Sequence, residues 1–223
     1  MRTVIGDILP FAVVVMVSPV NIVAAILLLF SNRPIINASW YLAGFLAGVT
    51  VVVTLLIVLA DALGLSSDSD RSRAVSGILV ALGAYLLFVA YRKFRSRSGP
   101  NDDPALPAWM DGIAGFGPAR SLATGAGIGA GNPKNIAVGL GTAVAVSSAG
   151  LTVADQIVTV AIYVVLASLG VATPIVVMLV LGERAPAVLE DWKEWLTRHN
   201  TAMMAVIFLF FGVFLIGKNL GGL

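Results

Sequence analysis

Six long apolar stretches dominate the sequence and decide what the chain can fold into. A helix that crosses a membrane needs about 20 mostly apolar residues. Charged residues make up 12% of the chain, against about 25% in soluble domains, and the mean hydropathy is +0.96. Segments of alternating polarity, typical of barrel strands, are not found. The sequence therefore predicts an all-α integral membrane protein with six transmembrane helices, at residues 8–30, 37–62, 74–92, 121–147, 153–182 and 200–218.

A Pro-x-Asn motif occurs in the first and fourth of these stretches. The two copies are Ser18–Ile22 and Asn132–Ile136, and their prolines lie 114 positions apart. Proline inside a helix removes one backbone donor and costs about 3 kcal/mol or more, and an unsatisfied backbone group in hydrocarbon is worse. Both helices are therefore predicted to be broken, with the freed carbonyls facing protein, water or a ligand.

The matched breaks divide the chain into two halves. Residues 1–93 form a first three-helix repeat, residues 94–120 a cytoplasmic linker with an interfacial helix, and residues 121–223 a second three-helix repeat. An odd number of spans in each half makes the two repeats inverted. Apolar residues at helical spacing also predict short helices in the membrane interface, in the linker (Leu106, Trp109, Met110, Ile113, Phe116) and before the last span (Val188, Leu189, Trp192, Trp195, Leu196).

Basic residues near the helix ends indicate the orientation. Nine lie on the side of the linker and four on the opposite side. Because cytoplasmic loops are enriched in lysine and arginine, this bias predicts a multi-pass plasma-membrane protein with both termini outside. The small net charge of +2 gives no indication of a nucleic-acid partner.

Glycines predict close helix contacts. The pair Gly44 and Gly48 predicts packing within the chain or in a homo-oligomer, and the run from Gly125 to Gly131 predicts either a close helix contact or an unwound segment.

Inverted repeats with broken helices indicate the binding site of a secondary transporter. Lys134 lies near the middle of the fourth stretch, whereas the matching position 20 is valine. A lysine at that depth costs about 2.5–3.5 kcal/mol, so it is expected to face a polar cavity or an anion; the alternative is that it snorkels or binds the carbonyls freed by the break. The predicted substrate-binding residues are Lys134, Asn135, Asn21, Pro19, Pro133, Asn132 and Ser18.

Two carboxylates form a second hypothesis. Asp7 opens the first span and Asp61 closes the second, which places both on the outer side. They are predicted to form a gate or a proton-coupling pair, and the alternative is that both are exposed helix ends.

Several classes of function are excluded. The chain has no cysteine, so it has no disulfide framework and no thiolate site. The single histidine, His199, lies near a helix end and no His/Asp/Glu cluster occurs, so no metal site or other cofactor is expected. Motifs of intramembrane or soluble hydrolases, such as H-E-x-x-H and G-x-S-x-G, are missing. The chain is predicted not to be an enzyme.

Five segments resemble the LysE transporter superfamily, and more closely its GAP branch, which includes sulfolipid-1-addressing and glycopeptidolipid-addressing proteins. They are Ser18–Ile22, Gly131–Ile136, Pro107–Asp111, Gly182–Ala185 and Trp195–Asn200. The resemblance implies a plasma-membrane protein that exports a cell-envelope glycolipid or other polar or anionic lipid, or assists its export beside a larger lipid transporter. Because other members of the superfamily export amino acids, export of a small amphipathic metabolite is the alternative.

Overall fold

The computed structural model describes residues 2–62, 69–95, 110 and 112–222, and within these ranges it contains helices and turns but no strand. The prediction of an all-α protein is confirmed. Most of the linker predicted at residues 94–120 lies outside the described residues. The main helices are α1 (Arg2–Met16), α2 (Pro19–Leu29), α3 (Pro34–Ala62), α4 (Ser69–Arg95), α5 (Pro118–Gly131), α6 (Pro133–Ser147), α7 (Val153–Leu181) and α8 (Ala185–Asn219).

Three helical stretches within the described residues are long and apolar enough to cross a membrane. They are Pro34–Ala62, Val75–Arg95 and Val153–Asn219, of 29, 21 and 67 residues. The bent pair of α1 and α2 gives a fourth candidate, since together they also meet the test. The chain is thus a multi-pass membrane protein.

Both predicted helix breaks are present. α1 ends before Ser18 and α2 begins at Pro19, with a bend of 52° between them; α5 ends before Asn132 and α6 begins at Pro133. Ser18 and Asn132 are both extended, as expected for a residue that precedes proline. Each proline opens a new helix, where its missing N–H would have had no partner. The cost of a proline inside a helix is therefore avoided at both breaks.

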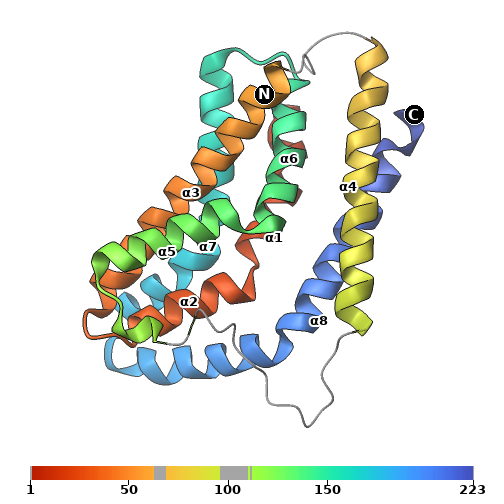
Figure 1. The fold of residues 1–223 in the computed structure, drawn as a ribbon. Helices are drawn as coiled ribbons and strands as arrows, with labels where there is room; N and C mark the ends of the chain where they lie inside the picture. Colours follow the sequence, from red (N-terminus) through yellow and green to blue (C-terminus); the bar gives the residue numbers. More distant parts are fainter. Residues whose placement is uncertain (1, 63–68, 96–109, 111, 223) are drawn as a thin grey trace.

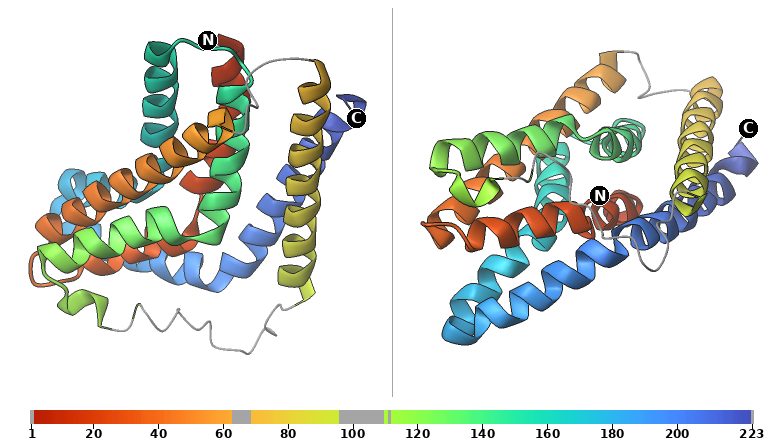
Figure 2. Two further views of the ribbon diagram at one scale, coloured as in Figure 1. Left: turned by 45° about the horizontal axis from the view of Figure 1, so that its top comes forward. Right: turned by 60° about the horizontal axis from the view of Figure 1, so that its bottom comes forward.

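The helices pack in matching pairs. α3 contacts both pieces of the second broken helix, α5 and α6, and α7 contacts both pieces of the first, α1 and α2. α4 packs along α8, and the two form the pair at the right of Figure 1. The two further views in Figure 2 show the same pair beside the other helices.

Glycines bring α3 and α5 into backbone contact. A Cβ at Gly44, Gly48 or Gly125 would overlap backbone atoms of the facing helix, whereas Gly127 has open space beside it. The run from Gly125 to Gly131 is helical, so the prediction of an unwound segment is wrong and that of close contact is correct. The Gly44 and Gly48 pair packs within the chain rather than between copies.

The predicted interfacial helix before the last span is continuous with that span. α8 runs for 35 residues; its first part lies along the bottom of Figure 1 and the rest rises beside α4. No proline or glycine stands between Ala187 and Phe211 to end the helix earlier. Near the end of the linker, by contrast, Met110 and Ile113 are buried, and the short helical turn Ile113–Gly115 packs against α2.

Candidate functional site

The start of α6 holds the second break together. The side-chain Oδ1 of Asn132 accepts a hydrogen bond from the backbone N–H of Lys134 at 3.0 Å, which caps the first turn of α6. Such a cap satisfies one of the four N–H groups that a helix leaves without a partner at its start. Asn132 is partly buried and Pro133 is exposed. Asn132 acts on this break as the cap of α6, and Pro133 acts as its first residue.

Lys134 joins the second break to the first. Its Nζ donates to the backbone carbonyl oxygen of Val14 at 3.2 Å, in the last turn of α1 and four residues before Ser18. A helix leaves its last carbonyls without intrahelical partners and carries a partial negative charge at that end, so an ammonium group there is favourable. The ammonium of Lys134 thus lies on a carbonyl at the end of the first broken helix.

The Asn135 side chain, in α6, donates to carbonyls at the end of α5, the helix that precedes the second break. Its Nδ2 donates to the carbonyl oxygens of Ile128 (3.1 Å) and Gly129 (3.3 Å), both in the last turn of α5. The side chain is 3% exposed, and its Oδ1 has no hydrogen-bond partner in the described part of the chain. Asn135 therefore supports the broken helix with its amide nitrogen and leaves one buried acceptor unused.

Asn21 occupies the equivalent position at the first break but makes none of these contacts. It is 1% exposed, and neither Oδ1 nor Nδ2 has a hydrogen-bond partner within the described residues. Its backbone carbonyl accepts a bond from Tyr41 Oη at 3.4 Å. Ser18 and Pro19 beside it are buried, and the Ser18 side chain does not cap α2. An entirely unpaired buried carboxamide is costly, so this side chain is a strong candidate for contact with a polar ligand.

The charge at the breaks is positive. No carboxylate lies within 4.0 Å of Lys134 Nζ among the described residues. The hydrogen bond to Val14 uses one of the three donors of the Lys134 ammonium. The two remaining donors can therefore bind an anionic group.

The whole chain was also compared with known proteins. The SfLAP family model, described as "Sap, sulfolipid-1-addressing protein", matches residues 8–221. The chain belongs to the SfLAP family. No match was found among curated proteins or among solved structures. The resemblance to sulfolipid-1-addressing proteins is thus confirmed over nearly the whole sequence, both breaks included.

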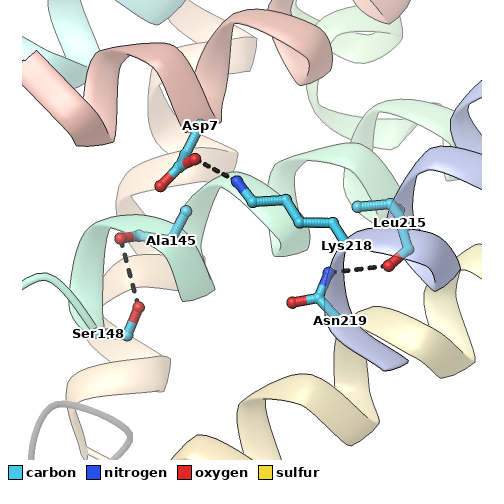
Figure 3. Close-up of polar contacts among 6 residues, drawn as sticks. All are labelled: Asp7, Ala145, Ser148, Leu215, Lys218 and Asn219. Atoms are coloured by element: carbon cyan, nitrogen blue, oxygen red, sulfur yellow. Dashed lines mark hydrogen bonds and ion pairs between the residues drawn. The ribbon is translucent and has the colours of Figure 1, made fainter. Parts of the chain in front are cut away.

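This SfLAP protein also has a cavity far from the breaks, of about 430 Å³, between α1, α4, α6 and α8. Asp7 and Lys218 line it and form an ion pair that links α1 to α8; Figure 3 shows the pair together with Ser148 and Asn219. Asp7 was one of the two carboxylates predicted as a gate. The other, Asp61, is exposed near the end of α3 and does not line this cavity.

Sequence reasoning missed two participants in these sites. Lys218 is not among the predicted site residues, although it stands at the end of the last predicted span, on the same side of the membrane as Asp7. The carbonyl of Val14 could not be found, because any apolar residue at that position offers the same backbone oxygen.

Proposed function

We propose that this SfLAP protein exports a polar or anionic lipid of the cell envelope, or assists a larger transporter in exporting it. The matching family model is named for the addressing of sulfolipid-1, and a sulfolipid head group is an anion. The protein would act in the plasma membrane with both termini outside. In this proposal Lys134 binds the head group, and the carboxamides of Asn21 and Asn135 contribute hydrogen bonds.

The observation that carries the proposal is the contact between Lys134 and Val14. A lysine deep in the membrane is costly, and here its charge is paired only with a neutral carbonyl among the described residues. An anionic head group would bind this ammonium more strongly than a carbonyl does, because a full negative charge adds Coulomb attraction to the hydrogen bond. A head group that drew the ammonium away from Val14 would remove this polar link between α1 and α6, which would couple substrate binding to the end of the first broken helix.

The pairing of helices supports an architecture of two inverted three-helix repeats. α1, α2, α3 and α4 would correspond in order to α5, α6, α7 and α8. Tyr41 and Gly48 in α3 have counterparts in Tyr163 and Gly170 of α7; both tyrosines are buried, and each glycine follows its tyrosine by about two turns. Gly48 meets the backbone of Ala126 in α5, and Gly170 meets that of Met16 in α1. Six spans result if each broken pair (α1 with α2, and α5 with α6) crosses the membrane once and α3, α4, α7 and α8 each cross it once.

The test is export by variants of the central lysine. Lys134→Met keeps most of the length of the side chain and removes its charge, and we expect it to lower the surface-extractable lipid at least tenfold. Lys134→Arg keeps the charge and should retain part of the export. The matched control is Lys193→Met, which removes a lysine that already pairs with Glu190. Wild-type export by Lys134→Met, at equal protein level, would refute the assignment of the site.

Comparison of a deletion strain with its complemented strain separates the two candidate substrates. Lipidomics of surface extracts would show loss of one lipid class if the protein exports a lipid. Loss of an amino acid or another small metabolite from the medium, with surface lipids unchanged, would instead establish the alternative. Intracellular accumulation of the same compound in the deletion strain would distinguish failed export from failed synthesis.

A further inference from the structure

α4 and α8 form an apolar groove on the surface of the bundle, apart from the helix breaks. It has a volume of about 380 Å³ and is lined by Leu87, Tyr91 and Phe94 of α4 and by Val206 and Leu209 of α8. Tyr91, Phe94 and Val206 are each 60% exposed. Since α4 contains one of the candidate membrane spans, the hydrocarbon of the bilayer is the natural contact of this groove.

The groove lies at the basic end of α4. Arg95 Nη1 donates to the hydroxyl of Tyr91 at 3.5 Å, which places one guanidinium beside a residue that lines the groove. The guanidinium carbon of Arg92 lies 5.9 Å from the centre of the Phe88 ring, one turn earlier on the same helix. Both arginines are exposed. An apolar groove whose end carries two exposed cations matches a lipid with an anionic head group.

We propose that this groove binds an anionic phospholipid of the surrounding membrane. One acyl chain lies between α4 and α8, and the phosphate contacts Arg92 and Arg95 at headgroup level. Basic side chains near the membrane surface attract anionic lipids, and the groove adds apolar contact that flat helix surfaces do not offer. The site is separate from Lys134 and does not depend on the proposed export.

The chain contains no cysteine, so a single introduced cysteine can be labelled without further changes. Phe210→Cys, beside the groove on α8 and 64% exposed in the wild type, would carry a bimane fluorophore in nanodiscs. Quenching is measured with phosphatidylglycerol or phosphatidylcholine that carries brominated acyl chains, at equal mole fractions. We expect stronger quenching by brominated phosphatidylglycerol. The same label at Val165→Cys, on the exposed face of α7, should show no preference.

Two further variants separate the parts of the site. Arg92→Gln with Arg95→Gln should weaken the phosphatidylglycerol preference roughly 25-fold, at roughly fivefold for each basic residue. The matched control, Arg120→Gln with Arg184→Gln, removes two exposed arginines elsewhere and should leave the preference unchanged. Val206→Phe fills the groove and should reduce quenching by both lipids. Equal quenching by the two lipids at position 210, or an equal loss of preference in the control pair, would overturn the proposal.

Discussion

The two helix breaks carry the same Pro-x-Asn motif, but different groups stabilise them. At the second break, Asn132 caps the new helix and Asn135 satisfies two carbonyls of the old one. At the first break, Ser18 caps nothing, Asn21 is unpaired among the described residues, and the donor to the end of α1 is Lys134 from the other half of the chain. The comparison shows that the second break is bonded by its own residues, while the end of α1 at the first break is bonded by a lysine from the other half of the chain, the residue that we propose binds the substrate.

The largest effect on stability is expected at the glycines where a broken helix meets the backbone of its neighbour. Gly125→Leu would force a side chain into the backbone of Tyr41, and we expect a loss of about 3 kcal/mol or more in the free energy of unfolding. Gly127→Leu, two residues later with open space around it, should cost far less, and Gly170→Leu should resemble Gly125→Leu, because Gly170 meets the backbone of Met16. Reversible unfolding in bicelles would measure all three; equal stability of the Gly125 and Gly127 variants would contradict the backbone contact.

Replacement by leucine should lower the stability of the protein at Asn135 but not at Asn21. Asn135→Leu leaves the carbonyls of Ile128 and Gly129 without a donor, which should cost about 1–3 kcal/mol. Asn21→Leu removes a buried carboxamide without partners, so the folded protein should be unchanged or more stable. The same unfolding assay measures both variants.

Export then tests whether Asn21 has a role beyond folding. A stable Asn21→Leu protein that exports poorly would mean that the carboxamide serves the substrate. Normal export by that variant would remove Asn21 from the proposed site while leaving Lys134 in it.

The smallest difference is expected at the caps. Asn132→Ala should destabilise the protein by about 1 kcal/mol, the usual cost of losing an N-cap side chain. Ser18→Ala should cost much less, because the Ser18 side chain makes no cap hydrogen bond. Thermal unfolding in detergent can rank the two variants. If the serine variant were the less stable of the pair, the assignment of the caps would be wrong.

Much of this arrangement could be predicted from the sequence. The hydrophobic stretches predicted an all-α membrane protein, and the prolines marked both breaks to within a residue, because the residue before proline avoids the helical conformation. A carbonyl at a break was one of the predicted partners of Lys134, but which carbonyl it binds could not be predicted, since every residue type offers the same backbone oxygen. The glycine run was ambiguous for a similar reason. Only the position of α3 shows that these glycines serve a contact rather than a flexible segment.

The backbone contact between α3 and α5 limits how the molecule can move. Because their backbones meet at Gly44, Gly48 and Gly125, the two helices already lie as close together as they can and cannot move nearer to each other. α3 also packs against α6, where Ser147 Oγ donates to the carbonyl oxygen of Ile57, so it contacts the helices on both sides of Asn132. α3 therefore bridges the second break, and any movement that opens the break between α5 and α6 has to displace α3 as well.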